Sequence, residues 1–536
     1  MDRKKVIVTE RIAEEGLALL RAELDVDFRD GIPREELLEI IDQYDALIVR
    51  SVTKVNEELI SRGTRLQVIG RAGNGVDNID VEACTRHGIT VANTPDSNTV
   101  SAAEQTISLL LSSIRNTAWA NDVLKGGSWD RKPFRGTELY EKTVGIVGLG
   151  RIGSMVAQRL KSFNMRVLAY DPYIGDERFQ RFGVEKMDTL EELAKLSDII
   201  TVHTPRNDET MYMVDEKILA LCKDGVHLVN CARGGIMKEA ALVEGLKSGK
   251  IASVGLDVYE KEPATENPLF DFKNVVCTPH LGADTFEAQK RVGENIAEQV
   301  ILALKGEIVP NVVNLPTLLS EELRYLKPYI LLAERMGSIY HQLFKGPVEQ
   351  VEMSYSGPIT LNDTGILTIA FLKGLMESYL GERVTYVNAR LMAEDRGIRI
   401  FEKHTERSSK RYKNMVNAVI KNQGRKLELG GTVSRAHEPI LVEFDDYETE
   451  AELEGYVLMV RNEDRPRVIG PVAMVLGDEN VNIAGMKVAR TAKGGTAIML
   501  INVDNELDRR VLEKVSEIDG VMEPGILLFF GDNKHE

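Results

Sequence analysis

The sequence has few cysteines, no long apolar run and no excess of positive charge. Its four cysteines lie far apart: Cys84, Cys222, Cys231 and Cys277. They show neither Cys-x-x-Cys spacing nor a metal-binding pattern, so we expect free thiols in a reducing cytoplasm and no metal site. No segment approaches the ~18 uninterrupted apolar residues of a membrane-spanning helix, and we expect no signal peptide.

The formal charge of −16 disfavours nucleic acids and anionic membranes as partners. An anionic small molecule stays possible as a substrate, because it needs only a local cluster of positive charge.

A chain of 536 residues is too long for one hydrophobic core, and its patterns divide it into four parts. Residues 1–96 alternate strand and helix patterns and are completed by 284–312, while 97–283 repeat the alternation around a glycine-rich turn. Residues 313–450 have a mixed pattern, and 455–536 follow the order βαββαβ. We therefore expect a Rossmann-type doubly wound parallel sheet inserted in a smaller flavodoxin-like α/β domain, followed by an α+β intervening domain and a ferredoxin-like domain.

Four local expectations complete this outline. We expect a helix over 101–125 and a strand followed by a turn over 427–432. The charged stretch 448–455 is typical of an acidic linker, and the last strand is expected over 520–530.

A glycine motif organises the second part. The apolar run 144–147 is followed by Gly148, Gly150 and Gly153, a helical pattern and a second apolar run that ends at Asp171. Gly148 permits the tight turn, Gly150 leaves room for a pyrophosphate, and Gly153 lets the helix pack close to the strand. Asp171 would accept hydrogen bonds from the ribose and repel a 2′-phosphate, so NAD is favoured over NADP. The alternative is a glycine turn in some other α/β unit, but the complete order of elements favours dinucleotide binding.

Three further residues follow predicted strands of the same sheet: Arg233, Glu262 and His280. A 2-hydroxy acid needs its carboxylate fixed, which suits arginine, and its hydroxyl proton removed, which suits histidine. A glutamate beside the histidine would orient the imidazole and stabilise its charged form. Singly, His280 could be an ordinary loop histidine and Glu262 a solvated acid. Their common place at the strand ends favours a catalytic group.

Four sequence blocks resemble the D-isomer-specific 2-hydroxyacid dehydrogenases. They are Gly-Leu-Gly-Arg-Ile-Gly (148–153), Asn-Cys-Ala-Arg-Gly-Gly-Ile (230–236), Leu-Asp-Val-Tyr-Glu-Lys-Glu-Pro (256–263) and Thr-Pro-His-Leu-Gly-Ala (278–283). Three more blocks resemble a branch of that family that oxidises D-3-phosphoglycerate: 50–51, 70–78 and 129–132. The resemblance extends through the C-terminal half, with an intervening domain like an allosteric substrate-binding domain and then an ACT domain.

The resemblance implies that His280 is the acid/base, Glu262 its partner and Arg233 the carboxylate anchor. It adds cofactor contacts at Arg151, Ile152, Asp171, Thr204, Cys231, Ala232, Asp257, Gly282, Ala283 and Asn74. The expected substrate-binding residues are Arg50, Ser51, Arg71, Asn74, Gly75 and Arg131. Some relatives have threonine at the position of Asn74. Arg131 is expected to reach the site of a neighbouring subunit, although a solvated basic loop is the alternative for the adjacent Lys132.

The resemblance further implies an amino-acid effector, L-serine, at a seam between two ACT domains. The amide and carboxylate groups expected there belong to Asn462, Asp464, Asn480 and Asn482. Arg467 stands where the usual ACT pattern has glycine, and we expect it to be tolerated only if that position avoids the left-handed backbone. An ACT dimer that only assembles the oligomer is the alternative.

Taken together, the resemblance implies a cytoplasmic homo-oligomer that oxidises D-3-phosphoglycerate with NAD to 3-phosphohydroxypyruvate, the entry step to L-serine. Within enzymes the alternative is a glyoxylate or hydroxypyruvate reductase, or another D-2-hydroxyacid dehydrogenase. A corepressor-like protein that uses the same fold to recruit partners, with NAD as a regulator, is the alternative from a different class.

Overall fold

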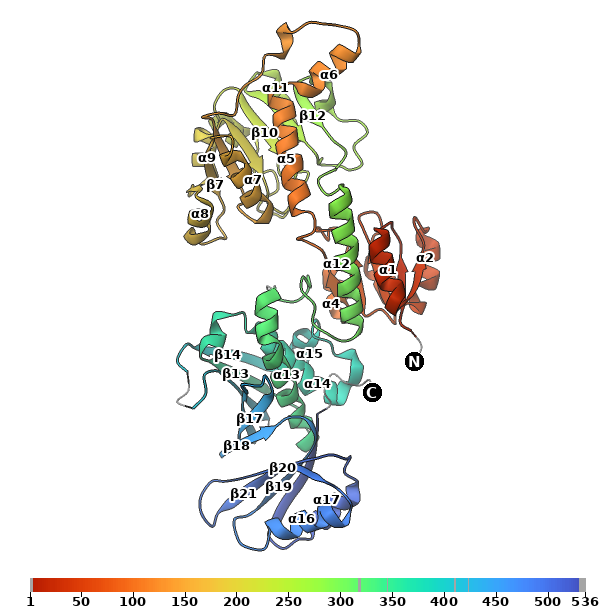
Figure 1. Cartoon of the computed structure of the whole chain (residues 1–536), viewed down its shortest axis with the longest axis vertical. Helices are drawn as coiled ribbons and strands as arrows, with labels where there is room; N and C mark the ends of the chain where they lie inside the picture. The colour runs from red at the N-terminus through yellow and green to blue at the C-terminus, as the bar shows by residue number, and fades with distance from the viewer. Residues whose placement is uncertain (1–2, 317–319, 345, 409–410, 423, 530–536) are drawn as a thin grey trace.

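The computed structural model describes residues 3–316, 320–344, 346–408, 411–422 and 424–529 (Figure 1). Four sheets of five, seven, six and four strands follow one another along the chain. The seven-stranded sheet lies at one end of an elongated molecule and the four-stranded sheet at the other, with the five-stranded sheet between them (Figure 1). Among the described helices, none is long and apolar enough to span a membrane.

The first sheet is parallel, in the order β2-β1-β3-β4-β5 that is typical of flavodoxin-like domains. Helices α1 and α12 pack on one face of this sheet, and α2, α3 and α4 pack on the other. The elements are β1 (Lys5–Val8), α1 (Glu14–Glu23), β2 (Asp25–Phe28), α2 (Arg34–Ile40), β3 (Ala46–Val49), α3 (Glu57–Arg62), β4 (Val68–Arg71), α4 (Val81–Arg86), β5 (Thr90–Ala92) and, after the second sheet, α12 (Phe286–Leu304).

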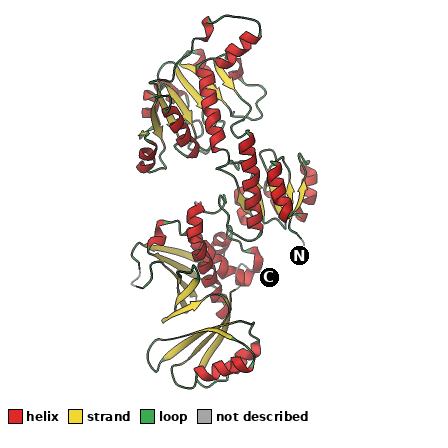
Figure 2. Cartoon of the chain, in the orientation of Figure 1, coloured by secondary structure: helices red, strands yellow, loops and turns green. Residues whose placement is uncertain are grey.

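The second sheet is also parallel, in the order β12-β11-β10-β9-β6-β7-β8. Helices cover both of its faces, as in a Rossmann-type doubly wound domain (Figure 2). Its elements are α5 (Thr99–Ile114), α6 (Thr117–Lys125), β6 (Thr143–Val147), α7 (Arg151–Lys161), β7 (Arg166–Tyr170), α8 (Asp176–Phe182), β8 (Glu185–Lys186), α9 (Leu190–Leu196), β9 (Ile199–Val202), α10 (Glu216–Leu221), β10 (Val226–Asn230), α11 (Glu239–Lys247), β11 (Ile251–Leu256) and β12 (Val275–Cys277).

The third sheet is mixed, in the order β14-β13-β15-β16-β17-β18. The long helices α13 and α14 pack closely together and bury their apolar residues against it. Its elements are α13 (Ser320–Leu343), β13 (Gln350–Ser356), α14 (Gly365–Leu380), α15 (Ala389–Asp395), β14 (Arg399–Thr405), β15 (Met415–Asn422), β16 (Arg425–Val433), β17 (Pro439–Phe444) and β18 (Tyr447–Glu452).

The C-terminal sheet is antiparallel, in the order β20-β21-β19-β22 of a ferredoxin-like ACT domain. Helices α16 and α17 cover one face, while the other face shares a hydrophobic core with the intervening domain. Both faces of this sheet are therefore buried. The elements are β19 (Gly455–Glu463), α16 (Ile469–Asp478), β20 (Ile483–Arg490), β21 (Thr496–Val503), α17 (Arg509–Ser516) and β22 (Val521–Phe529).

The fold class expected from the sequence is confirmed, but three local expectations are wrong, and a fourth, on Arg467, is corrected below. The helix expected over 101–125 is broken at Asn116, which has a left-handed φ of 53° between α5 and α6. The turn expected within 427–432 is absent, because these residues belong to the continuous strand β16, whose pairing with β17 shifts register between Gly430 and Gly431. The expected acidic linker is mostly the strand β18. Phe530, expected in the last strand, lies outside the described residues.

The fourth correction concerns Arg467. Its φ is 70°, so this arginine adopts the left-handed backbone, and the condition under which we expected it to be tolerated does not hold. A non-glycine residue in this region costs about 1–2 kcal/mol. The exposed Arg467 stands between the end of β19 and the start of α16, where the chain must turn sharply.

Candidate active site

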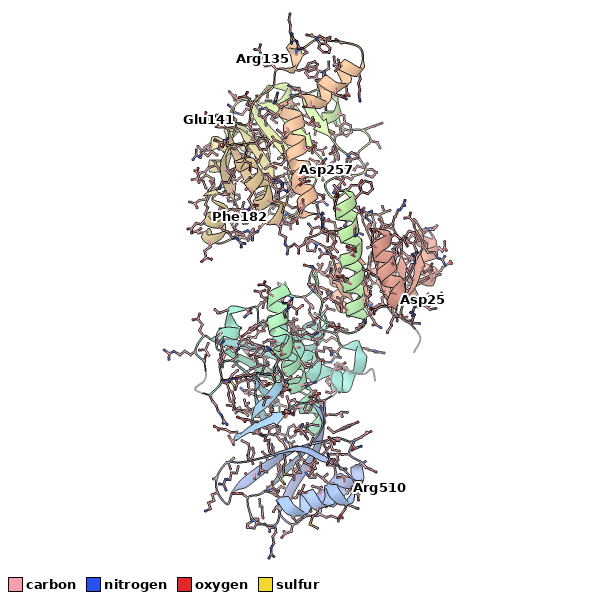
Figure 3. All side chains as sticks on the ribbon, in the orientation of Figure 1. Asp25, Arg135, Glu141, Phe182, Asp257 and Arg510 are labelled. Atoms are coloured by element: carbon pink, nitrogen blue, oxygen red, sulfur yellow. The ribbon has the colours of Figure 1, made fainter. Side chains whose placement is uncertain are left out.

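The first two domains are joined by two chain crossings that lie side by side. One crossing links β5 to α5, and the other links β12 to α12 (Figure 1). The hydroxyls of Ser101 and Thr285 are 2.7 Å apart, and the Gln299 side chain donates to the carbonyl of Asn93 at 3.0 Å. Strand ends from both sheets therefore face a common region, which includes the end of the second domain where Asp257 is labelled (Figure 3).

The glycine-rich turn after β6 has the shape that a dinucleotide requires. Gly148 has a φ of 90°, and a Cβ atom built at Gly153 would lie 2.1 Å from the carbonyl oxygen of Gly148. A Cβ atom at Gly150 would meet nothing within 4 Å. The space at Gly150, directly before α7, lets a pyrophosphate approach the free N–H groups of the helix N-terminus. Arg151 and Ile152 are the first residues of that helix.

Asp171 follows β7 beside this turn. Its carboxylate accepts hydrogen bonds from the backbone N–H groups of Leu149 at 2.9 Å and Tyr173 at 3.1 Å. The acid is thus fixed against the glycine turn, as binding of the adenosine ribose requires. Thr204, after β9, has a buried hydroxyl without a hydrogen-bond partner among the described residues, which also fits a ligand in this region.

The turn that carries His280 is held from beneath by Asp257, which is completely buried. The Asp257 carboxylate accepts hydrogen bonds from the Thr278 hydroxyl at 2.5 Å, the Leu281 N–H at 2.8 Å and the Gly282 N–H at 2.7 Å. Its backbone carbonyl accepts the N–H of His280 at 2.9 Å. Asp257 therefore positions the expected cofactor turn, and its carboxylate is already engaged within the protein.

His280 and Glu262 form a hydrogen-bonded pair. The imidazole Nδ1 lies 2.8 Å from Oε2 of Glu262, whose Oε1 accepts the N–H of Tyr259 at 3.0 Å. Burial disfavours ionisation of Glu262, but the hydrogen bonds from His280 and Tyr259 outweigh it and hold the carboxyl pKa below its usual range. A carboxylate at Nδ1 assigns the proton to that nitrogen and leaves Nε2 free to take a proton from a ligand.

Arg233 follows β10 and meets the first domain. Its Nη1 donates to the carbonyl of Ala232 at 2.7 Å, and its Nε lies 3.7 Å from Oδ2 of Asp77. A Cβ atom at Gly75 would lie 2.4 Å from an Nη atom of Arg233, so a larger residue there would displace the guanidinium. Cys231, between β10 and Ala232, is buried.

Arg50 and Arg71 bring two further cations from the first domain. Burial, followed by the nearby charges of Arg233 and Arg50, lowers the pKa of Arg71 to about 10. The buried Nε of Arg71 has no hydrogen-bond partner among the described residues. Three arginines from two domains therefore form one cationic cluster, which an anionic ligand would stabilise.

The remaining expected site residues lie near the arginine cluster or the His280 turn, except for Arg131. Asn74 lies beside the cluster and its carbonyl accepts from Asn93 at 2.6 Å, while Ser51 follows Arg50 in the loop after β3. Gly282 and Ala283 belong to the His280 turn. The exposed Arg131 lies on a different feature, the arm of residues 117–135 that projects from the second domain (Figure 1). The arm lies at the end of that domain remote from the first domain, and its Arg135 is labelled in Figure 3.

In the ACT domain, the four expected effector residues are near the ends of β19 and α16. Asn462 is 2% exposed, and its Oδ1 has no hydrogen-bond partner among the described residues. Asp464 accepts from the Gly494 N–H at 2.9 Å and from Arg490 at 3.2 Å. Asn482 donates to Asp504 at 2.6 Å, and Asn480 has a left-handed φ of 57°.

Sequence reasoning missed Glu10, Asp77 and Asn78, which contact or hold the arginine cluster. Glu10 lies just beyond β1, as Arg50 follows β3. The rule that groups at the carboxyl ends of parallel strands meet at one edge could have identified Glu10.

Comparison with known proteins matches family models to three parts of the chain. Residues 107–282 match the NAD-binding domain of the D-isomer-specific 2-hydroxyacid dehydrogenases. Residues 325–445 match the D-3-phosphoglycerate dehydrogenase intervening domain, and 456–520 match the ACT domain. Among solved structures, TT0316 from Thermus thermophilus is 32% identical with a TM-score of 0.54, covering 58% of this chain and 99% of its own. A D-lactate dehydrogenase from Aquifex aeolicus, complexed with NAD and lactic acid, is 30% identical with a TM-score of 0.50, covering 56% and 96%.

The fold, the glycine turn and the His280–Glu262 pair define this protein as one of the NAD-dependent D-2-hydroxyacid dehydrogenases. A D-3-phosphoglycerate dehydrogenase of Methanocaldococcus jannaschii is 43% identical over 98% of this chain and 99% of its own length. That of Bacillus subtilis is 38% identical over 97% and 98%, respectively. The chain belongs to the D-3-phosphoglycerate dehydrogenase family, in its long form with intervening and ACT domains.

Proposed function

We propose that the chain oxidises D-3-phosphoglycerate to 3-phosphohydroxypyruvate with NAD, the first step of phosphorylated L-serine biosynthesis. The observation that carries this proposal is the convergence of Arg50, Arg71 and Arg233 from two domains on the side of the His280–Glu262 pair. A simple 2-hydroxy acid offers one carboxylate, whereas this substrate adds a phosphate that needs further cations. The near full-length match to phosphoglycerate dehydrogenases supports the same substrate.

The reaction divides among these residues according to their chemistry. Arg233 pairs with the substrate carboxylate, and Arg50 and Arg71 pair with the phosphate. Nε2 of His280 accepts the proton of the C2 hydroxyl, and Glu262 stabilises the resulting imidazolium through Nδ1. NAD, when bound, accepts the hydride from C2. Loss of that proton and hydride leaves a carbonyl at C2, which balances the oxidation.

Other residues hold the cofactor. The N–H groups at the start of α7 bind the pyrophosphate above Gly150, and Asp171 accepts from the adenosine ribose. The Thr204 hydroxyl supplies a further polar contact.

Replacement of His280 tests this mechanism. His280→Ala should lower the rate of NADH formation about 10²- to 10⁴-fold, which is the usual effect of removing a positioned acid/base. Near-normal turnover would rule out His280 as the base.

The competing functions agree less well with the comparisons. A glyoxylate reductase from Paecilomyes thermophila is 31% identical with a TM-score of 0.54, but it covers only 58% of this chain. A corepressor-like protein would need no His280–Glu262 pair. NADH formation from D-3-phosphoglycerate distinguishes these functions directly.

The domains take separate tasks in this proposal. Residues 1–96 with 284–312 bind substrate, 97–283 bind NAD, and the intervening domain begins at 313. It extends to 450, and this proposal is supported by β18 (Tyr447–Glu452), which pairs within its sheet. Residues 455–536 form the regulatory ACT domain. We place the enzyme in the cytoplasm.

A homo-oligomer is part of this proposal. Helix α6 of the arm buries none of its side chains, while Trp129 is 80% and Leu124 53% exposed. Exposed apolar residues on a projecting arm favour contact with another copy of the chain.

L-serine is the proposed effector of the ACT domain. The buried Asn462, whose Oδ1 has no partner among the described residues, offers an acceptor for an ammonium group, and the amide of Asn482 can bind a carboxylate. Serine inhibits only if it binds an inactive arrangement better than the active one. When L-serine is titrated against the dehydrogenase activity of wild type and of Asn482→Ala, it should inhibit wild type more strongly. If serine neither inhibits wild type nor binds to it in calorimetry, the ACT domain serves only to assemble the oligomer.

A further inference from the structure

The loop after β3 is bound to one carboxylate through its backbone. Glu10 accepts hydrogen bonds from the N–H groups of four consecutive residues: Arg50 at 2.9 Å, Ser51 at 3.1 Å, Val52 at 3.1 Å and Thr53 at 2.9 Å. Burial disfavours ionisation of Glu10, but these bonds outweigh it and lower its carboxyl pKa. The loop N–H groups are therefore satisfied within the protein, which leaves the side chains of Arg50 and Ser51 to bind a ligand.

The same segment also contacts the side chain of Arg50. The Nη1 atom of Arg50 donates to the carbonyl of Arg11, next to Glu10, at 3.3 Å. From the other side, the Asn78 amide donates to the carbonyls of Arg50 at 2.9 Å and Thr53 at 2.7 Å. Glu10 and Asn78 thus hold the N–H and C=O groups of one loop.

Glu10 also contributes a charge. Its carboxylate raises the pKa of Arg71, opposing the effects of burial and of the cations Arg233 and Arg50. The three arginines repel one another before an anionic substrate arrives, and the negative charge of Glu10 offsets part of that repulsion.

We infer that Glu10 is a positioning residue for substrate selection, which fixes Arg50 and Ser51 where the phosphate of the substrate binds. This inference rests on the proposed function, since it assigns the loop after β3 to the substrate phosphate. Glu10 does not touch the reacting atoms, so its effect should appear in substrate discrimination rather than in the chemical step.

Asp45 provides a matched control in the same domain. It is 2% exposed, accepts the N–H of Lys5 at 2.8 Å and pairs with Arg65 at 3.1 Å. Asp45 precedes β3, whereas Glu10 follows β1, so the two acids lie at opposite edges of the parallel sheet. Loss of either charge should affect folding stability, but only Glu10 adjoins the substrate loop.

The experiment compares Glu10→Gln, Asp45→Asn and wild type in the full-length protein. KM is measured for D-3-phosphoglycerate and for D-glycerate. Where D-glycerate is turned over too slowly, its competitive inhibition constant is measured instead. In Glu10→Gln an amide N–H faces two loop N–H groups, so KM for the phosphorylated substrate should rise about tenfold while the D-glycerate constant stays nearly unchanged. Asp45→Asn should lower the melting temperature and leave the ratio of the two constants unchanged.

Three results would overturn the inference. The ratio of the constants for D-3-phosphoglycerate and D-glycerate could stay unchanged in Glu10→Gln, or it could change equally in Asp45→Asn. Both constants could also fall in Glu10→Gln, which would mean that the loss of a negative charge only strengthens the binding of anions. If Glu10→Gln does not fold, Asn78→Ala carries the test, because it releases the same loop from its carbonyl side. An unchanged ratio in Asn78→Ala would then overturn it. A different result would contradict the proposed function itself: wild type would show no preference for D-3-phosphoglycerate over D-glycerate.

Discussion

Nδ1 of His280 lies 2.8 Å from Oε2 of Glu262, and the other oxygen of that carboxylate accepts the N–H of Tyr259. The carboxylate is thus fixed by the backbone on one side and orients the imidazole on the other. This relationship fixes the tautomer of His280, because a carboxylate at Nδ1 keeps the proton on that nitrogen and leaves Nε2 to act as the base.

Glu262→Gln keeps the shape of this pair but removes its charge. We expect kcat to fall about 10²-fold or more, because the imidazolium formed on proton transfer loses its charged partner. Glu260→Gln is the matched control, since Glu260 accepts the N–H of Glu239 at 2.8 Å rather than bonding His280. Equal effects of the two substitutions would indicate a folding role for Glu262.

Asp171 should determine the choice between NAD and NADP. Asp171→Asn removes the charge that repels a 2′-phosphate and weakens the ribose contact, so the ratio of kcat/KM for NAD to that for NADP should fall about ten- to hundredfold. Asp176→Asn controls for a nearby exposed acid, which pairs with Lys186 at 2.6 Å. An unchanged ratio in Asp171→Asn would place the ribose elsewhere.

Arg131 should act in a neighbouring subunit. Arg131→Gln is expected to raise KM for D-3-phosphoglycerate about tenfold, the size of one weakened charge-assisted contact. In mixed oligomers of Arg131→Gln and His280→Ala subunits, a site with intact His280 and a donated Arg131 should recover the wild-type KM. Mixtures that retain only the raised KM would show that Arg131 acts within its own subunit.

The stability contributed by Glu10 should depend on pH in a defined direction. Its folded pKa lies below that of the unfolded carboxyl, so the contribution is present above the unfolded value of about 4.3 and is lost as pH falls through the folded pKa. The difference in melting temperature between wild type and Glu10→Gln should therefore be largest near neutral pH and shrink below about pH 4. A difference that is constant or grows on acidification would contradict the ionised state of Glu10.

Local patterns predicted much of the fold and site. The glycine turn and Asp171 were identifiable because each residue's task depends on neighbours within one βαβ unit. The strand β18 was missed because Glu448, Glu450 and Glu452 suggested a charged linker, although they alternate with buried residues as a strand requires. The high charge of this segment drew attention away from its alternation of buried and exposed residues, which is typical of a strand.

Long-range contacts account for the other omissions. Glu10 binds N–H groups 40 to 43 residues away, so no local pattern indicates its task. The Asp77–Arg233 ion pair joins two domains and depends on how they face each other. Arg467 shows the converse case, where a turn overrides the backbone preference of its residue.

The most direct test of the account is NADH formation by wild type with D-3-phosphoglycerate, D-glycerate and D-lactate under one set of conditions. The arginines 50, 71 and 233 predict kcat/KM for D-3-phosphoglycerate about 100-fold or more above that for either unphosphorylated acid, as expected when two charge-assisted contacts of about 1.4 kcal/mol each are lost. Equal or faster turnover of an unphosphorylated acid would contradict the assignment of the arginine cluster to a phosphorylated substrate.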